Sequence, residues 1–138
     1  MWTLRCDGGS RGNPGPGAFG FVLSDPEGRE REAKGEYLGT VTNNVAEYRA
    51  LIAGLEAAGR HGARSLRVVM DSELVIRQMT GEYRVKNEGL KPLHAEARRK
   101  AAAFADVSYQ SVGREANERA DRLVNEALDK VMGTESPR

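Results

Sequence analysis

The sequence predicts an α/β fold in which helices flank a mixed five-stranded sheet whose first three strands are antiparallel. Two patterns support this fold class. Segments in which apolar and polar residues alternate, as in strands, come first along the chain. Segments with apolar residues every three or four positions, as in helices, then alternate with further strands. This order is typical of a sheet covered by helices.

Length and composition agree with one domain. The 138 residues are 39% hydrophobic and 30% charged, and a chain of this size buries roughly two-thirds of its unfolded surface. We expect one catalytic domain over residues 1–132 and a disordered tail over residues 133–138. No apolar run approaches the roughly 20 residues of a spanning helix, and the first residues lack a signal-peptide layout. We therefore expect a cytoplasmic protein without a membrane partner and, by default, a monomer.

The first three strands are predicted from alternation and turn residues. Apolar and polar residues alternate over residues 2–7, and a turn rich in glycine and proline separates them from the apolar run 18–23. These two segments predict a hairpin. A turn signal follows, and the polar alternation of residues 29–38 then predicts a third strand at the edge of the sheet.

The remaining segments alternate between helix and strand. Apolar spacing and capping residues predict a helix over 45–60, a strand over 65–70, a short helix from Ser72 to Met79, a loop over 81–89, a helix over 90–104, a strand over 106–112 and a helix over 117–131. Pro92 is tolerated in the first turn of its helix, and Asn117 can cap the last one.

Cysteine and histidine are too few to form a zinc cluster. Cys6 is the single cysteine and is expected to be a buried small residue, whereas His61 and His94 are the two histidines and are expected at the surface. Any metal must therefore be held by oxygen. The formal net charge of +1 argues neither for nor against nucleic acid, because local positive surface decides such binding.

Four acids stand near the ends of separate elements. Asp7 lies where the first strand meets the glycine-rich turn, Glu47 near the start of the first long helix, Asp71 directly after a buried strand, and Asp121 early in the last helix. Ligands of open α/β sheets bind beyond the carboxyl ends of parallel strands. Carboxylates that meet there repel one another unless a cation neutralises them, so the four together predict a divalent metal site for phosphoryl chemistry. Taken singly, each would be interpreted as a turn residue or a cap, and Glu73 is expected to be an exposed helix residue.

Five sequence blocks carry a resemblance to a known family. They are residues 7–10 (Asp-Gly-Gly-Ser), 12–17 (Gly-Asn-Pro-Gly-Pro-Gly), 42–47 (Thr-Asn-Asn-Val-Ala-Glu), 71–72 (Asp-Ser) and 117–121 (Asn-Glu-Arg-Ala-Asp). In this order, and over nearly the whole chain, they resemble ribonuclease H type 1. The resemblance implies a ribonuclease H-like fold and an endonuclease that hydrolyses the RNA strand of RNA–DNA hybrids.

The resemblance also implies which residues are catalytic. Asp7, Glu47, Asp71 and Asp121 match the family's metal-binding carboxylates. They would hold two Mg²⁺ ions about 4 Å apart across the scissile phosphate, and Mn²⁺ would substitute because it accepts the same oxygen ligands. The expected products carry 5′-phosphate and 3′-hydroxyl ends.

Neighbouring residues are predicted to contact the substrate. Gly8 and Gly9 allow the backbone to approach a substrate closely. Asn13, Asn43 and Asn44 offer amides that donate and accept, which suits the 2′-hydroxyls and base edges in the minor groove of an A-like helix.

Further substrate contacts are expected from phosphate-binding residues. Thr42 resembles the family's contact to a phosphate of the DNA strand. Arg84, Lys86 and Asn87, together with Tyr83, lie in the loop where some relatives insert a basic handle. Tyr83, Lys86 and Asn87 are predicted to supply a smaller version of this handle. The basic residues Arg77, Arg84, Lys86 and Lys91 are predicted to track the backbone of the hybrid.

The chain departs from the family in one catalytic loop. Many members carry a histidine before the last helix, whereas residues 110–115 contain none. Arg114 is the nearest candidate for a replacement role in electrostatics or product release.

Two alternatives remain open from the sequence. A module that binds hybrids without cutting is disfavoured by the presence of all four mutually repelling acids. A related metal-dependent nuclease or strand-transfer enzyme acting on DNA is disfavoured by the Asn43 and Asn44 block and the glycine-rich block, which suit 2′-hydroxyl recognition.

Overall fold

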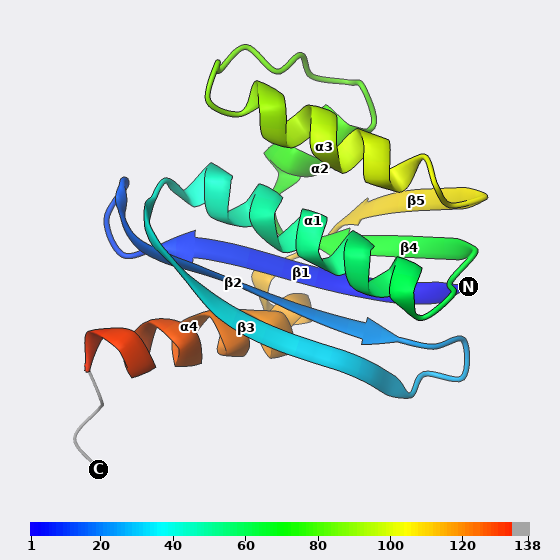
Figure 1. The fold of residues 1–138 in the computed structure, drawn as a ribbon, viewed down its shortest axis with the longest axis horizontal. Coiled ribbons are helices and arrows are strands. Elements are labelled where there is room, and N and C mark those ends of the chain that lie inside the picture. The colour runs from blue at the N-terminus through cyan, green and yellow to red at the C-terminus, as the bar shows by residue number, and fades with distance from the viewer. Residues whose placement is uncertain (134–138) are drawn as a thin grey trace.

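Five strands form one mixed sheet in the order β3-β2-β1-β4-β5 (Figure 1). The structure is a computed structural model that describes residues 1–133. Its elements are β1 (Trp2–Ser10), β2 (Gly15–Ser24), β3 (Glu30–Val41), α1 (Asn43–Arg60), β4 (Ser65–Met70), α2 (Glu73–Met79), α3 (Lys91–Ala101), β5 (Asp106–Ser111), a 3₁₀ turn η1 (Arg114–Asn117) and α4 (Glu118–Met132). Strands β1 to β3 are antiparallel, and β4 runs parallel to both β1 and β5. The predicted fold class is confirmed, and β3 is an edge strand as expected.

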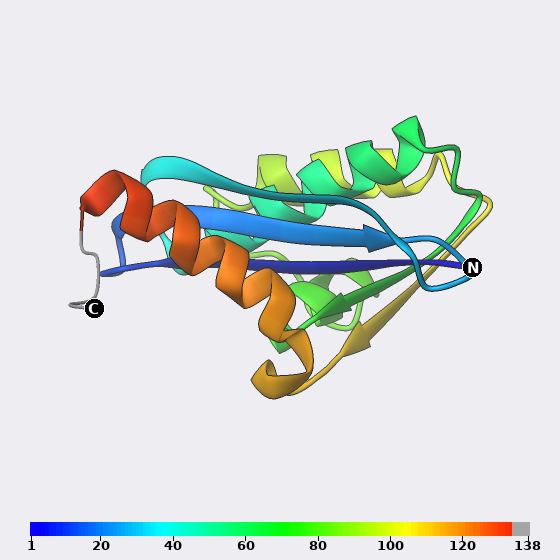
Figure 2. The same cartoon turned by 90° about the horizontal axis from the view of Figure 1, so that it is seen from below.

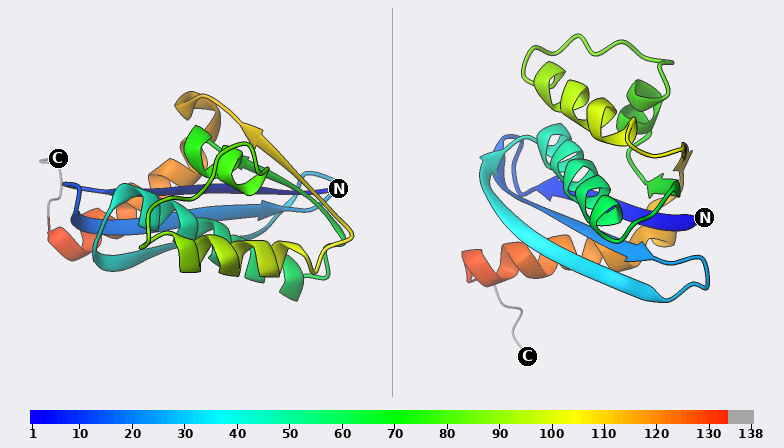
Figure 3. Two further views of the ribbon diagram at one scale, coloured as in Figure 1. Left: turned by 90° about the horizontal axis from the view of Figure 1, so that it is seen from above. Right: turned by 45° about the vertical axis from the view of Figure 1, so that its right-hand side comes forward.

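Helices cover both faces of the sheet (Figures 2 and 3). Helices α1 and α3 lie on one face and α4 lies on the other. The larger apolar cluster joins α1, α2 and α3 to the strands and includes Leu4, Tyr48 and Leu51. A much smaller cluster of Val124 and Leu128 against Ala18 holds α4. Cys6 belongs to the larger cluster and is fully buried, as predicted.

Strand β1 is longer than the sequence predicts. Asp7 does not end the strand, because antiparallel pairing with β2 continues to Ser10, opposite Gly17. Parallel pairing with β4 ends earlier, at Cys6 opposite Met70. Asp7 is therefore the first residue of β1 beyond the carboxyl end of its parallel partner, which is where ligands of such sheets bind.

The helix boundaries also differ from the predictions. Helix α1 begins at Asn43, two residues early, because the Thr42 hydroxyl accepts a hydrogen bond from the Val45 N–H at 3.3 Å and caps the first turn. Gly133 was expected to begin the tail. Instead it closes α4 in the left-handed region, at φ 67°, and its N–H donates to the Asp129 carbonyl oxygen. The other residues of the expected tail, 134–138, lie outside the described residues.

Both histidines reach the surface, as predicted, but each is half-buried by its contacts. The Nε2 atom of His61 lies 3.0 Å from the Glu32 carboxylate, and that of His94 lies 3.1 Å from the Gln78 carbonyl oxygen. The partners are distant in sequence, so no local pattern indicates them. Among residues 1–133, no helix has both the length and the apolar character needed to cross a bilayer.

Candidate active site

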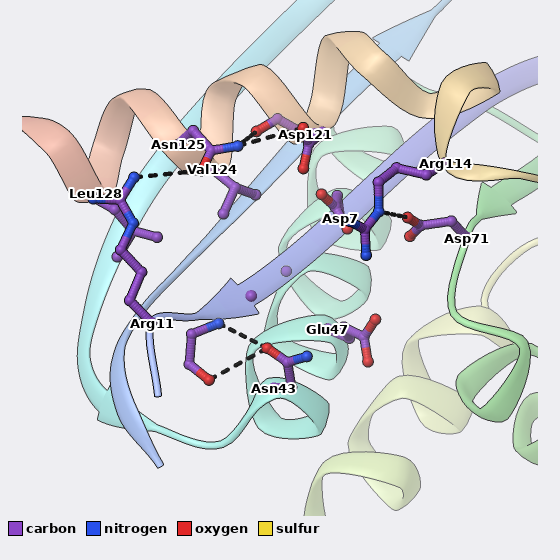
Figure 4. A pocket seen from close by; sticks show the side chains of 13 residues that line it. Asp7, Arg11, Asn43, Glu47, Asp71, Arg114, Asp121, Val124, Asn125 and Leu128 are labelled. Carbon is purple, nitrogen blue, oxygen red and sulfur yellow. Dashed lines mark hydrogen bonds and ion pairs between the residues drawn. The ribbon is translucent and has the colours of Figure 1, made fainter. Parts of the chain in front are cut away.

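The four predicted carboxylates line one cavity (Figure 4). The acid cavity, lined by Asp7, Glu47, Asp71 and Asp121 among others, has a volume of about 380 Å³. Asp7 comes from β1, Glu47 from α1, Asp71 from the residue after β4, and Asp121 from α4. Four elements that are separate in sequence thus bring their acids to the same place.

Three of the acids are mutually close. One carboxylate oxygen each from Asp7, Glu47 and Asp71 lies within 4.8 Å of the other two, and no other group of this kind occurs within residues 1–133. Asp121 lies outside this group of three but is close enough to Asp7 to contribute to the raised pKa of the Asp7 carboxyl. The cluster consists of the hard oxygen ligands that Mg²⁺ and Mn²⁺ prefer.

The surroundings of Asp7 and Glu47 disfavour the ionised form of their carboxyls. Asp7 is only 7% exposed, and its burial, with repulsion from Asp71 and contacts to Asp121, raises its pKa to about 9. Burial also raises the pKa of Glu47 to about 7; a hydrogen bond from Ser72 opposes the shift and the Asp71 charge adds to it. A bound cation would restore the charged carboxylates. These donors therefore fit the metal that the sequence predicts.

Ser72 connects two parts of the site. Its hydroxyl oxygen accepts a hydrogen bond from the Val75 N–H at 3.3 Å, which caps α2 as predicted. Ser72 also lies beside the Glu47 carboxylate, where it opposes the rise of the Glu47 pKa. Ser72 was predicted only as a cap, and its position directly after Asp71 is the signal that marks it as a neighbour of the site.

Gly8 lines the cavity and also has a packing role that the sequence does not predict. A Cβ atom at this position would lie 2.3 Å from the Ala46 carbonyl carbon and 2.5 Å from the Glu47 nitrogen. The glycine is therefore needed for β1 to touch the first turns of α1, which sets Glu47 beside Asp7. Gly9 lines the cavity, and a Cβ there would meet its neighbours only at 3.8 Å. Close approach to a substrate is thus sterically open at Gly9.

Two further glycines position α4. A Cβ on Gly20 would lie 2.7 Å from the Ala120 carbonyl oxygen, and one on Gly35 would lie 2.6 Å from that of Leu123. The helix backbone therefore rests directly on β2 and β3. Because Gly20 pairs with Asp7 across the sheet, the helix segment over Gly20 carries Asp121 to the cavity.

Asn117 stands at the N-cap position of α4, as predicted, but its side chain makes no capping hydrogen bond. Its side chain is 1% exposed, and its amide donates to the carbonyl oxygen of Cys6 at 2.8 Å. The Oδ1 atom has no hydrogen-bond partner. Asn117 therefore ties the turn before α4 to β1, one residue before Asp7. The sequence separation of 111 residues hides this contact from any local pattern.

Two of the predicted substrate amides hold the protein together. The Asn43 Oδ1 atom accepts from the Ser10 N–H at 2.8 Å, and the Asn13 Oδ1 atom accepts from the Asn43 N–H at 3.0 Å. Asn43 also lines the acid cavity, so its amide nitrogen is the part suited to a substrate. Asn44 is half-buried outside the cavity lining, and Thr42 is exposed beside it.

The predicted basic residues lie apart from the acids. Arg84 lines a second hollow with Tyr83 and Lys91, between α2 and α3. Lys86 is exposed. The Asn87 side chain accepts a hydrogen bond from the Gly89 N–H at 2.8 Å and shapes the loop. A substrate would have to extend beyond the acid cavity to reach this surface.

Arg114 lies at the acid cavity, as its predicted role requires. Its Nε atom is 3.8 Å from the Asp71 carboxylate, and its side chain is 83% exposed. Arg11, Val124, Asn125 and Leu128 also line the cavity, and sequence reasoning missed them. Val124 and Asn125 carried a signal, because they lie one helical turn after Asp121.

The fold and its acid cavity define a candidate metal-binding hydrolase, and comparison with known proteins identifies the family. A family profile described as Reverse transcriptase-like matches residues 5–127. The chain is 43% identical over 150 residues to the bifunctional protein Rv2228c of Mycobacterium tuberculosis, 46% over 123 residues to ribonuclease HI of Halobacterium salinarum, and 38% over 144 residues to ribonuclease H of Hydrogenovibrio crunogenus. These alignments cover 98%, 89% and 94% of this chain.

The chain spans 41% of the mycobacterial protein, 62% of the halobacterial protein and 97% of the Hydrogenovibrio protein. Solved structures agree. The N-terminal RNase H domain of the mycobacterial protein has a TM-score of 0.91 at 43% identity, over 93% of this chain and 98% of that one. LC11-RNase H1 in complex with an RNA/DNA hybrid has a TM-score of 0.90 at 41% identity, over 96% and 99%. The chain belongs to the ribonuclease H type 1 family, and the predicted family is confirmed.

Proposed function

We propose that the chain is an endonuclease that hydrolyses the RNA strand of RNA–DNA hybrids with two Mg²⁺ ions. The observation that carries this proposal is the convergence of the Asp7, Glu47 and Asp71 oxygens within 4.8 Å, with Asp121 in the same cavity. The similar LC11-RNase H1 was solved with a hybrid bound, which supports the substrate class.

The four carboxylates would hold the metal ions. When bound, Mg²⁺ supplies neutralising charge at the scissile phosphate and lowers the pKa of the attacking water. The protein's part is to present oxygens from a buried position, where raised pKa values make the carboxyls poor anions without a cation. Cleavage in this arrangement would leave 5′-phosphate and 3′-hydroxyl ends, and Mn²⁺ would replace Mg²⁺.

Recognition of the hybrid would rest on residues beside the cavity. The free amide nitrogen of Asn43 and the open backbone at Gly9 suit the 2′-hydroxyls that distinguish RNA from DNA. Asn13 and Asn44 would support the same contact, and exposed Thr42 would meet a phosphate of the DNA strand.

The surface between α2 and α3 would extend the binding site. Arg84 and Lys86 would contact phosphates of the hybrid outside the acid cavity, with Asn87 shaping the loop that carries them. Tyr83 is 44% exposed and is covered by Arg77, whose guanidinium lies 5.4 Å from the ring centre. Binding of hybrid phosphates at this surface would weaken steeply as the salt concentration rises.

Arg114 would act during turnover. Its long, exposed side chain lies beside Asp71. A positive group there would stabilise the negative charge that develops when the phosphodiester is cleaved and the product leaves. This role replaces the loop histidine that the chain lacks.

The test uses end-labelled RNA–DNA hybrid, duplex DNA and duplex RNA, each with Mg²⁺, Mn²⁺ or chelator. Cutting confined to the RNA of the hybrid, and lost in chelator and in Asp7→Asn, is expected. Uncut hybrid with a mobility shift would indicate a binding module, and cut duplex DNA would indicate a DNA nuclease. Either result contradicts the proposal.

A further inference from the structure

Asp121 is held differently from the other three acids. It lies outside the close group of three oxygens, and α4, which carries it, is held by the smaller apolar cluster. Asn125, one turn further along α4, donates its amide N–H to both the backbone oxygen of Asp121, at 3.1 Å, and its carboxylate, at 3.3 Å. These contacts are drawn in Figure 4. The direction of the Asp121 carboxylate therefore depends on the direction of the Asn125 amide.

Arg11 holds the other end of Asn125. The Arg11 Nη2 atom lies 3.4 Å from the Asn125 Oδ1 atom and 2.7 Å from the Asp129 carboxylate. The Arg11 N–H also donates to the Pro16 carbonyl oxygen at 2.8 Å, which fixes the turn between β1 and β2. The turn that follows Asp7 is thus connected to α4 through a guanidinium.

The charges on either side determine how Asn125 is oriented. The amide oxygen faces a positive guanidinium and the amide nitrogen faces a negative carboxylate. Rotating the amide by 180° would set N–H against the cation and oxygen against the anion, so both contacts would become repulsive. Asparagine suits this position because it accepts from one side and donates to the other.

We propose that Asn125, held by Arg11, is a positioning residue that sets the Asp121 carboxylate for metal binding. This inference rests on the proposed function of the acid cavity. Hydrogen bonds to a ligating carboxylate orient it and are felt in metal affinity. Neither residue touches the metal or the reacting phosphate in this role; both act through Asp121.

The direction in which cation affinity changes when Arg11 is removed distinguishes this positioning role from a purely electrostatic one. Removing the positive charge of Arg11 would strengthen cation binding nearby if charge alone mattered. If Arg11 acts through Asn125 instead, its removal weakens cation binding, because the amide is no longer held against Asp121. The two mechanisms therefore predict opposite changes.

The experiment measures Mn²⁺ affinity by titration calorimetry without hybrid, and kcat and KM for hybrid cleavage with Mg²⁺. Asn125→Ala should raise the Kd for Mn²⁺ about threefold to tenfold, at or below the lower end of typical supporting-residue effects because Asn125 is exposed. The value of kcat should fall by a similar factor while KM changes less than about twofold. Arg11→Ala should act in the same direction and more weakly, and Arg11→Lys should recover part of the loss.

A double-mutant cycle tests whether the two residues act in series. In the Asn125→Ala background, Arg11→Ala should weaken Mn²⁺ binding no further, so the two effects are not additive. The matched control is Arg119→Ala, which also removes an arginine that ties α4 to the sheet, through Glu30 at 2.9 Å. It should leave Mn²⁺ affinity within about twofold of the wild type.

Three outcomes would overturn the inference. Unchanged or tighter Mn²⁺ binding in Asn125→Ala or Arg11→Ala would show that the contacts do not orient Asp121. A rise in KM alone would make Asn125 or Arg11 a direct substrate contact. Equal losses in Arg119→Ala would indicate a general loosening of α4. If the wild type neither binds Mn²⁺ nor cuts hybrid, the proposed function fails instead.

Discussion

Replacing Asp7 by asparagine should stabilise the metal-free protein while abolishing cleavage. Asp7 is 7% exposed and lies among other acids. Asparagine has nearly the same shape but no charge. The substitution therefore removes the repulsion and the desolvation that disfavour the charged carboxylate, together with the metal ligand.

The sign and size follow from the pKa of Asp7. Its pKa rises from 3.8 to about 9 on folding, so the folded state binds the proton more tightly than the unfolded state. The contribution of protonated Asp7 to the free energy of unfolding is then fully present below about pH 4 and is lost progressively up to about pH 9. At about 1.4 kcal/mol per pH unit, the loss by pH 7 is at most about 4 kcal/mol. Relaxation of the protein and entry of water reduce this loss. We therefore expect Asp7→Asn to raise the free energy of unfolding at pH 7 by about 2 kcal/mol.

The assay is thermal and urea unfolding in chelator at pH 5, 7 and 9, followed by circular dichroism. A gain of about 2 kcal/mol at pH 7 corresponds to roughly 7 °C in Tm for a domain of this size. The wild type should lose stability as the pH rises, and the variant much less. Glu47, whose pKa rises from 4.5 to about 7, leaves a smaller dependence in both. Mg²⁺ should stabilise the wild type more than the variant. An Asp7→Asn protein that is less stable, or has an unchanged pH dependence, would refute the reasoning.

Three other substitutions and one control test how the site is built and how it works. Gly20→Val should destabilise the protein by about 1–3 kcal/mol in urea unfolding and lower kcat, because the side chain would push α4 away from β2. The control is Gly59→Ala, where a Cβ meets nothing within 4 Å; it should be neutral or stabilising by up to about 1 kcal/mol. Equal losses of stability in the two variants would contradict this reasoning. Arg114→Ala should lower kcat more than it raises KM in steady-state cleavage, and an unchanged kcat would dismiss its role. Asn117→Leu should lower the free energy of unfolding by about 1–3 kcal/mol, because it removes a buried hydrogen bond to the Cys6 carbonyl oxygen. A stability equal to that of the wild type would show that this bond contributes nothing.

Much of the fold could be predicted because its signals are local. Alternation, helical spacing and capping residues such as Thr42 and Ser72 depend on neighbours a few positions away. The acids could be predicted as a group because Asp7 and Asp71 come directly after the last parallel pair of β1 and β4, at one edge of the sheet.

The contacts that support the acids could not be predicted in the same way. The sequence predicts that Gly8 lets the backbone approach a substrate, but it does not show that the missing side chain also allows β1 to touch α1. Asn117 reads as a cap, but it is a buried tie to Cys6. The Arg11 contact to Asn125 spans 114 positions. Each depends on how closely two elements pack, which no local pattern records.

The sequence alone determined the element order, the family and the four acids, since these follow from periodicity and from short blocks of residues. Only the tertiary structure decided that three acids lie within 4.8 Å while Asp121 is supported from α4. It also separated the acid cavity from the surface that carries Arg84 and Lys86. The physical reason is that periodicity reflects which face of an element is buried, whereas the positions of the acids depend on backbone contacts at Gly8 and Gly20 between distant parts of the chain.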